Sequence, residues 1–308
     1  MVLSNLELVC CISSVLFLVT ILIALFIIGV VRRTKPRLHT CRHFLMCNSS
    51  VAWIVSCTIL IMNYIHLFFL PSQTSDISCR YRGYLAYMSI TAVTYSYLIQ
   101  SISRLFFSLL STKHATLVTF KTHSILIGLN WLTAVVIPLS TIITSDIRFI
   151  SGSLCWIRPE AYLHGFMIVI IEYAIPLGLV MVIYAYIYCE VKKRRRNARS
   201  NTIVASKGRL ELELLRNIAV LVGIFLLGGV WTFIYVITSI KLFDLIGIVM
   251  VSLCASAVQI CTIALDRDFR QVVQSMFRTN TRVNPLATTQ QVRTIETKGI
   301  CTPNKTPS

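Results

Sequence analysis

The feature of the sequence that most constrains its fold is a series of seven long apolar runs. A helix of about 20 apolar residues spans the roughly 30 Å hydrocarbon layer of a bilayer. Helix is the expected conformation because every backbone N–H and C=O must find its partner within the segment. The runs extend over Leu8–Val31, Phe44–Leu70, Tyr84–Leu110, Ser124–Ile143, Leu163–Cys189, Leu214–Ile240 and Leu245–Leu265. The sequence therefore predicts an all-α membrane protein, a bundle of seven transmembrane helices.

The composition agrees with this prediction. Of the 308 residues, 56% are hydrophobic and only 13% are charged, whereas about a quarter of a soluble domain is charged. The third run is the least apolar, and its ends are the hardest to place. The first run has no basic residue before it and is longer than the apolar part of a signal peptide. We therefore expect it to be retained as the first membrane helix.

The positions of Lys and Arg predict the orientation. With the amino terminus outside the cell, all but five of the 29 basic residues fall on the inner side, and cytoplasmic segments are enriched in such residues. The five exceptions are Arg80, Arg82, Arg148, Arg158 and Lys241. The expected location is the plasma membrane, with the carboxyl terminus in the cytoplasm. The net charge of +17 then favours the attraction of the protein's inner side to the anionic lipids of the inner leaflet. No nucleic-acid partner is expected, because the basic segment Lys192–Arg196 directly follows an apolar run.

The runs divide the chain into four predicted parts. Residues 1–7 form a short extracellular amino terminus, and residues 8–265 form the seven-helix bundle. Residues 266–278 place their apolar side chains on one face, which predicts a short amphipathic eighth helix lying in the membrane interface. Residues 279–308 are polar and rich in threonine, so we expect a disordered cytoplasmic tail.

Two of the 11 cysteines, Cys79 and Cys155, fall in segments that the predicted topology places outside the cell. Disulfides persist in that oxidising compartment, so we expect these two to be joined; two unpaired thiols are the alternative. The bond would tie the loop before the fifth run to the start of the third. It would thus restrict the loop before any ligand binds.

Seven apolar runs, an outside amino terminus and this disulfide resemble the class A (rhodopsin-like) G-protein-coupled receptors, over residues 1 to about 278. The resemblance implies an unknown extracellular ligand and a cytoplasmic heterotrimeric G protein. The sequence contains no metal-ligand pair, nucleophile elbow or phosphate-binding loop, so an enzyme is not expected, and neither a metal nor a cofactor is predicted.

Several activation positions of that family carry matching residues. Arg104 lies 25 residues after Cys79, where the family has the arginine that ends its third helix. The resemblance implies that its resting partner is Glu211 on helix six; the alternative is an anchor reaching lipid headgroups. Pro176 and Tyr184 match the family's helix-five proline and activation tyrosine.

Three core motifs of the family are altered. Aligning Asn48 with the family's helix-two asparagine places Trp53 where a sodium-binding aspartate is expected. Helix six has Gly228-Gly229 in place of a cysteine and the switch tryptophan, although adjacent glycines can permit bending. Residues 258–262 replace the helix-seven Asn-Pro-x-x-Tyr motif. A divergent receptor is predicted, whose switching relies on Arg104, Tyr184 and the diglycine.

Glu172 is the one acidic residue well inside a predicted span. It is either a counter-ion for a cationic ligand or a protonated carboxyl bonded to a neighbour. The expected ligand cavity is aromatic and apolar with one acid, which suits a small peptide or an organic cation. Each candidate has packing as its alternative role. The candidates for its lining are Tyr84, Tyr87, Met88, Thr91, Trp156 and Glu172.

The predicted function is transmission of a signal from an extracellular peptide or small organic molecule to a G protein, by an outward movement of helix six. The tail suits phosphorylation by a receptor kinase and binding of an arrestin-like protein, or it is an unmodified spacer. Two other functions remain open. A transporter or channel would usually show internal repeats and several central ionisable residues. A receptor-like protein that no longer couples to a G protein would explain the altered motifs.

Overall fold

A computed structural model gives the arrangement of most of the chain. The described residues are 5–34, 38–69, 75–110, 115–144, 146–147, 154–157, 161–197 and 202–278. Within these ranges the side chains of residues 109–110, 115, 162, 194–197, 202–219 and 277–278 are not described. The predicted tail, 279–308, lies outside the described residues.

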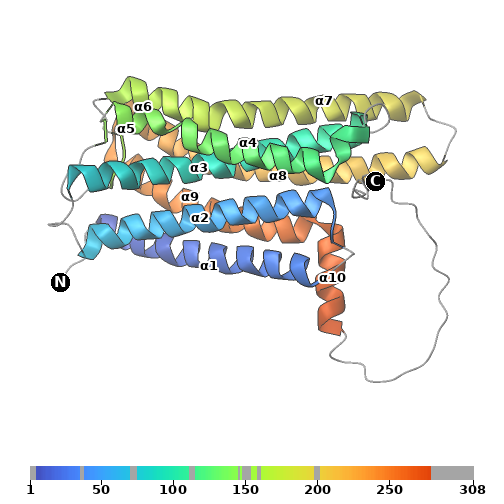
Figure 1. Cartoon of the computed structure of the whole chain (residues 1–308), viewed down its shortest axis with the longest axis horizontal. Coiled ribbons are helices and arrows are strands. Elements are labelled where there is room, and N and C mark those ends of the chain that lie inside the picture. The colour runs from blue at the N-terminus through green and yellow to red at the C-terminus, as the bar shows by residue number, and fades with distance from the viewer. Residues whose placement is uncertain are drawn as a thin grey trace, which may run out of the picture.

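The described part is helical, and its helices form one elongated bundle (Figure 1). The fifth membrane helix is made of α6, η5 and α7, and the fourth of α4 and α5. The elements are α1 (Asn5–Arg33), α2 (Cys41–Phe69), α3 (Asp76–Leu105), η2 (Phe106–Leu110), η3 (Ala115–Val118), α4 (Phe120–Val136), α5 (Leu139–Ile143), α6 (Tyr162–Val169), η5 (Ile170–Ala174), α7 (Ile175–Asn197), α8 (Thr202–Thr238), α9 (Lys241–Leu265) and α10 (Arg267–Arg278). The predicted all-helical bundle is confirmed.

Six helical stretches of the described part are long and apolar enough to cross a membrane, and α3 is not among them. The six are Asn5–Arg33, Cys41–Phe69, Phe120–Ile143, Leu163–Lys193, Val220–Thr238 and Lys241–Leu265. The physical reason is that α3 packs against α2, α4, α5, η5 and α7, so it meets protein more than lipid. It accordingly carries buried hydroxyls, including Ser89, Thr91 and Ser96.

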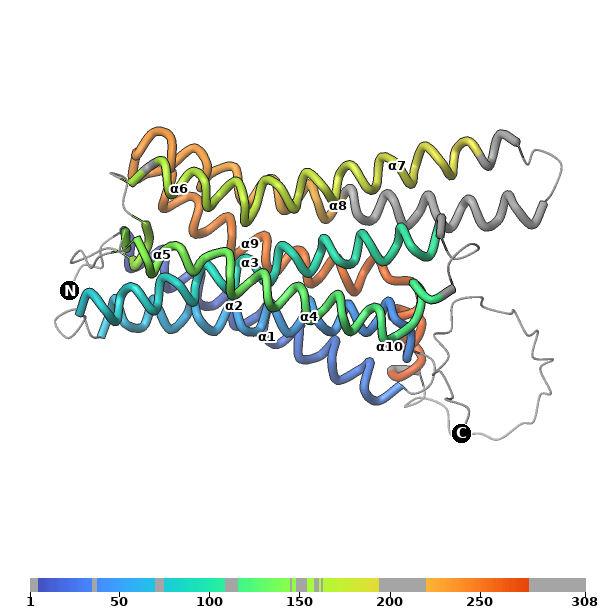
Figure 2. The backbone as a smooth tube through the Cα atoms, turned by 45° about the horizontal axis from the view of Figure 1, so that its top comes forward, coloured from blue at the N-terminus to red at the C-terminus, as the bar shows by residue number. Residues whose placement is uncertain are grey.

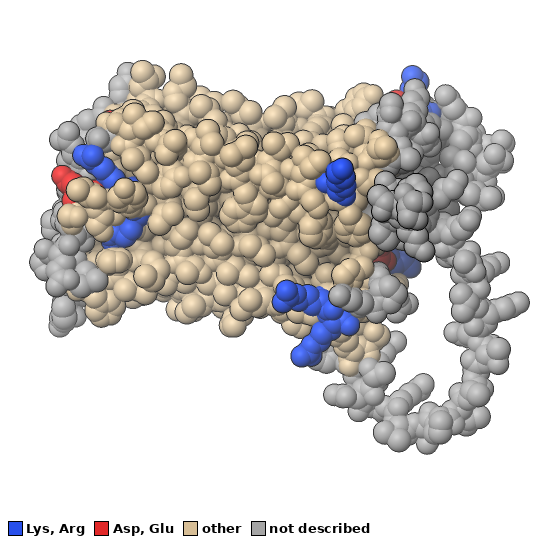
Figure 3. Space-filling model, viewed as in Figure 1, with Lys and Arg blue, Asp and Glu red and all other residues tan. Residues whose placement is uncertain are grey.

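The outer surface of the bundle is apolar, whereas several of its internal contacts are polar. Leu18, Leu22 and Leu25 of α1 are all more than half exposed. On its buried face, the Thr20 hydroxyl lies 3.0 Å from the Ser256 hydroxyl of α9. Small and hydroxyl-bearing residues between helices with apolar residues outside are typical of membrane bundles. In Figure 3 the described Lys, Arg, Asp and Glu side chains gather toward the two ends, with an uncharged zone between them.

The amphipathic helix α10 lies across one end of the bundle, opposite the end where α1 begins (Figures 1 and 2). Phe269 and Val272 are buried against a cluster that includes Ile27 of α1. Asp266 starts the helix by accepting a hydrogen bond from the Phe269 N–H at 3.0 Å, and it also pairs with Arg42 of α2 at 3.0 Å. The predicted short eighth helix is thereby confirmed, and we call this the α10 end.

Candidate functional site

The opposite end of the bundle carries the disulfide between Cys79 and Cys155, as predicted, and we call it the disulfide end. Both cysteines are buried together with Ile147, and their Cα atoms are 5.3 Å apart. Ile147 pairs with Ile157 in a single antiparallel β-bridge. The two loop segments are therefore fixed to the start of α3.

Gly83 is the point at which this loop crosses α3. A Cβ atom there would lie 2.6 Å from the Cys155 carbonyl oxygen and 2.7 Å from Ile147 Cδ1. These distances are far below van der Waals contact, and one of the two atoms is backbone. The absence of a side chain thus lets the loop lie directly on the helix.

Gly83→Ala is expected to destabilise the protein by about 1–3 kcal/mol, the usual cost of overpacking. Thermal unfolding of the detergent-solubilised protein would measure the change. Gly128→Ala in α4 is the matched control, because nothing lies within 4 Å of a Cβ atom at that glycine. If both variants unfold at the wild-type temperature, the loop does not rest on Gly83 in this way.

The loop also contacts α3 through aromatic side chains. The rings of Tyr87 and Trp156 pack edge to face with centroids 5.2 Å apart. The Ile157 N–H donates a hydrogen bond to the Tyr87 hydroxyl at 3.3 Å. Trp156 follows Cys155 directly, so the disulfide holds the indole at the mouth of the helical bundle.

Below this loop is a cavity of about 240 Å³. Its walls come from α1, α2, α3, the loop, α6, η5, α8 and α9, and they are mostly apolar or aromatic. The lining residues include Phe17, Trp53, Leu60, Tyr64, Tyr87, Ile90, Trp156, Ile168, Glu172, Tyr173, Phe225, Tyr235, Asp244, Ile248 and Cys254. A concave, mainly apolar site with a few polar groups is typical of small-molecule binding.

Among the described residues, two acidic residues line the cavity, and no Lys or Arg does. Glu172 is 3% exposed, and its Oε1 atom has no hydrogen-bond partner within the described part of the chain. Asp244 lies in the first turn of α9. The sequence interpretation missed Asp244 because the last apolar run was started one residue later, which placed this acid in the preceding loop.

Three of the predicted cavity residues, Tyr87, Trp156 and Glu172, are brought together there, and three others are not among its lining residues. The Tyr84 hydroxyl donates to the Val135 carbonyl of α4 at 3.0 Å. Met88 packs against the core of the bundle. Thr91 donates to the Tyr87 carbonyl at 2.8 Å and lies beside the Glu172 side chain. These three face neighbouring helices.

Glu172 lies in a π turn, η5, in the middle of the fifth helix. The Ile175 N–H donates to the Ile170 carbonyl, five residues back. Pro176 follows and has no N–H to donate. The carbonyls of Ile171 and Glu172 therefore lose the donors that a regular helix would supply. Such π turns are frequently found at functional sites.

Hydroxyl groups of α3 supply these missing donors. Thr94 Oγ1 donates to the Glu172 carbonyl at 2.7 Å, and the Tyr95 hydroxyl donates to the Ile171 carbonyl at 3.1 Å. Buried backbone carbonyls need such partners, above all in a membrane. The irregular turn is thus held in place by the neighbouring helix.

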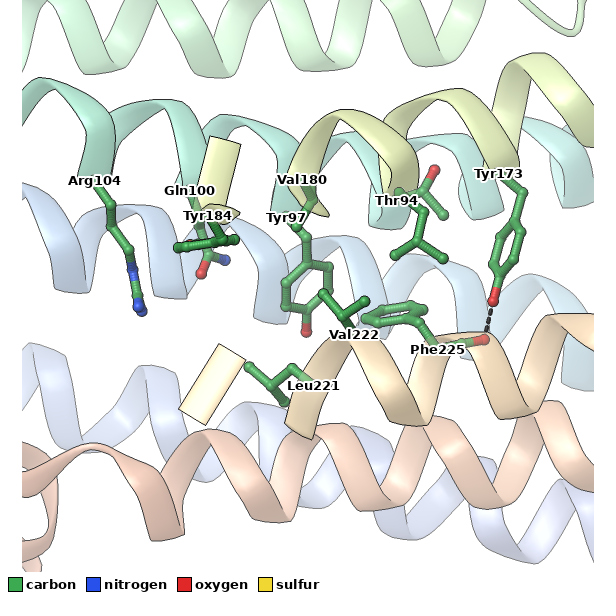
Figure 4. A pocket seen from close by; sticks show the side chains of 11 residues that line it. Thr94, Tyr97, Gln100, Arg104, Tyr173, Val180, Tyr184, Leu221, Val222 and Phe225 are labelled. Carbon is green, nitrogen blue, oxygen red and sulfur yellow. Dashed lines mark hydrogen bonds between the residues drawn. The ribbon is translucent and has the colours of Figure 1, made fainter. Parts of the chain in front are cut away.

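Toward the α10 end lies a second, smaller cavity of about 30 Å³ (Figure 4). Arg104 and Tyr184 both line it, together with Gln100 of α3. Within the described residues, Arg104 Nη1 has no hydrogen-bond partner. The side chain of Glu211, its predicted partner, lies outside the described residues. The preceding Ser103 faces α4 instead, with its hydroxyl 2.7 Å from His123 Nε2.

The altered helix-two position is filled by the Trp53 side chain. Its Nε1–H donates to the Tyr97 hydroxyl at 3.0 Å, and its ring stacks on Phe225 with centroids 6.1 Å apart. Nearby, the Trp131 Nε1–H donates to Asn48 Oδ1 at 3.0 Å, joining α4 to α2. Trp53 thus occupies the centre of the bundle with its polar atom satisfied.

The diglycine of helix six allows two neighbours to approach closely. A Cβ at Gly228 would lie 3.1 Å from Cys254 Sγ of α9. A Cβ at Gly229 would overlap the ring of Tyr173. The helix α8 runs without interruption through both glycines. Close packing is therefore the role that the structure gives to these residues, in addition to the predicted capacity for bending.

This architecture, helices with a lipid-facing apolar exterior around a disulfide-covered cavity, defines a multi-pass membrane protein of the receptor type. Residues 23–245 match the family model described as 7 transmembrane receptor (rhodopsin family), and the chain belongs to that family. Family membership confirms the predicted resemblance and implies signalling through a G protein rather than enzymatic activity. No curated protein matches the sequence significantly.

Proposed function

We propose that the protein is a G-protein-coupled receptor whose extracellular ligand is a small organic cation bound in the 240 Å³ cavity. The observation that carries this proposal is the Glu172 oxygen that has no partner among the described residues, in a cavity whose described lining includes a second acid and neither Lys nor Arg. A buried carboxylate without a cation is costly, and a cationic ligand would supply the missing partner.

The size and the walls of the cavity support a small ligand. An apolar cavity of about 150 Å³ admits benzene, so this one has room for an aromatic ring with a short cationic arm. Tyr87, Trp156 and Tyr235 line it, and aromatic faces attract ammonium groups. A ligand anchored at Glu172 or Asp244 would therefore find both charge and aromatic contact.

The orientation in the plasma membrane is part of the proposal. An extracellular disulfide end is supported by the stability of disulfides outside the cell. At the opposite end, Arg32, Arg33, Lys192 and Lys193 are all exposed, and basic residues concentrate on the cytoplasmic side. The α10 end with Arg104 and Tyr184 would then face the G protein. A receptor kinase and an arrestin-like protein would act on the carboxyl-terminal tail.

Glu172→Gln is expected to lower the potency of cationic agonists by roughly 10- to 100-fold, equal to about 1.4–2.8 kcal/mol. The amide keeps the shape of the side chain but removes its charge. Asp244→Asn would act in the same direction. The measurement is a set of G-protein reporters in cells exposed to aromatic amines and to their uncharged isosteres.

Asp76→Asn is the control, because Asp76 is an exposed acid of the same end that does not line the cavity. Its dose–response curves should match those of the wild type. A potency loss of equal size for the uncharged isosteres would contradict a role of the Glu172 charge. Amine-dependent ion flux in vesicles without any reporter response would instead favour a transporter.

A further inference from the structure

Tyr173 is the residue next to Glu172 in the π turn, and its side chain crosses from helix five to helix six. Its hydroxyl donates a hydrogen bond to the Phe225 carbonyl of α8 (Figure 4). In a regular helix that carbonyl accepts the N–H of Gly229, four residues later. The tyrosine hydroxyl therefore binds the same backbone carbonyl of α8 that the Gly229 N–H would bind in a regular helix.

The ring of Tyr173 occupies the space that any side chain at position 229 would need. Position 229 of helix six is itself a glycine and supplies no side chain. An aromatic side chain is nevertheless present at this place in the bundle. It comes from helix five.

Tyr173 also lies between the two cavities. Tyr173, Phe225 and Thr94 line both the 240 Å³ ligand cavity and the 30 Å³ cavity that holds Arg104 and Tyr184. A ligand in the larger cavity can therefore contact the ring of Tyr173. The same ring forms a wall of the smaller cavity.

We propose that Tyr173 is the residue through which a ligand in the cavity acts on α8. The inference rests on the proposed function, and it names the side chain that couples the two ends. A ligand that displaces the ring withdraws the hydroxyl from the Phe225 carbonyl. The hydrogen bond between helix five and α8 is then broken. Because Gly229 has no side chain, α8 is free to shift past the ring.

The first test is an aromatic exchange between positions 173 and 229 in the purified full-length protein. Gly229→Trp alone is expected to unfold at a lower temperature than the wild type, because the indole overlaps the tyrosine ring. Adding Tyr173→Ala should restore most of the loss. If Tyr173→Ala lowers the unfolding temperature of the Gly229→Trp variant further, the two positions do not share one space and the inference fails.

The second test asks whether the hydroxyl holds α8 in place. Spin labels on Cys189 of α7 and on a Val220→Cys variant of α8 report the separation of the helices in lipid nanodiscs, with the other free cysteines replaced by serine. Both labelled positions are exposed. Tyr173→Phe should raise the population of the larger separation about three- to tenfold, as expected for loss of one hydrogen bond. Basal reporter signalling should rise with it.

Tyr186→Phe is the matched control, since Tyr186 lies on α7 with its side chain exposed. It should leave both the distances and the basal signal unchanged. Wild-type distances and wild-type basal signalling in Tyr173→Phe would overturn the inference. If no reporter responds to any form of the protein, the proposed coupling fails, and the distance measurement alone still decides the role of Tyr173.

Discussion

Replacing both Cys79 and Cys155 by serine is expected to destabilise the protein by about 2–5 kcal/mol and to abolish its response to ligand. The bond holds the loop on α3 and places Trp156 at the mouth of the cavity. Without it, the loop must be ordered at the moment of binding, which reduces affinity. Thermal unfolding and agonist dose–response curves of the double variant would measure the two effects.

The free cysteines provide the control for this experiment. Cys11 and Cys189 are both exposed and unpaired, so replacing them with serine removes two thiols without breaking a bond. That variant should unfold at the wild-type temperature. A Cys79/Cys155 double variant that keeps both wild-type stability and wild-type potency would show that the disulfide does not organise the cavity.

Trp53→Asp, which restores the family's usual residue, is expected to destabilise the protein by at least about 3–5 kcal/mol, the usual cost of losing a buried tryptophan. The indole is 6% exposed, stacks on Phe225 and donates to Tyr97. Its removal leaves a void, and an added carboxylate would be buried without a cation. The variant should accumulate poorly in membranes and unfold at a much lower temperature.

Trp53→Phe separates the contributions to this loss. Phenylalanine keeps the stacking surface and removes only the N–H donor, so a loss of about 1 kcal/mol is expected, together with the cost of the smaller ring. The measurement is thermal unfolding in detergent for both variants. Wild-type stability of the aspartate variant would mean that the position tolerates a charge and that the indole is not required.

The parts of the fold that follow from the composition of long segments could be predicted from the sequence. Apolar runs gave the helices because a bilayer leaves no other way to satisfy the backbone. The disulfide followed from the side of the membrane on which Cys79 and Cys155 were placed. The weak apolar signal of the third run is explained by its position, since α3 meets protein on most sides and carries buried hydroxyls.

The details of the candidate site depend on packing between helices, which periodicity does not specify. Thr91 and Glu172 are in contact across two helices, but nothing local in the sequence indicates the π turn that positions Glu172. The sixth apolar run of the sequence begins at Leu214, whereas α8 already begins at Thr202. Polar residues there do not prevent a helix that continues outside the membrane.

The π turn also has a consequence for how helix five can change. Pro176, Thr94 and Tyr95 form one unit, because the proline removes a donor and the two hydroxyls replace what is lost. Replacing the proline alone would restore a backbone N–H, which would compete with those hydroxyls for the carbonyls of helix five. Any redesign or natural variation that straightens this helix must therefore alter both helices together.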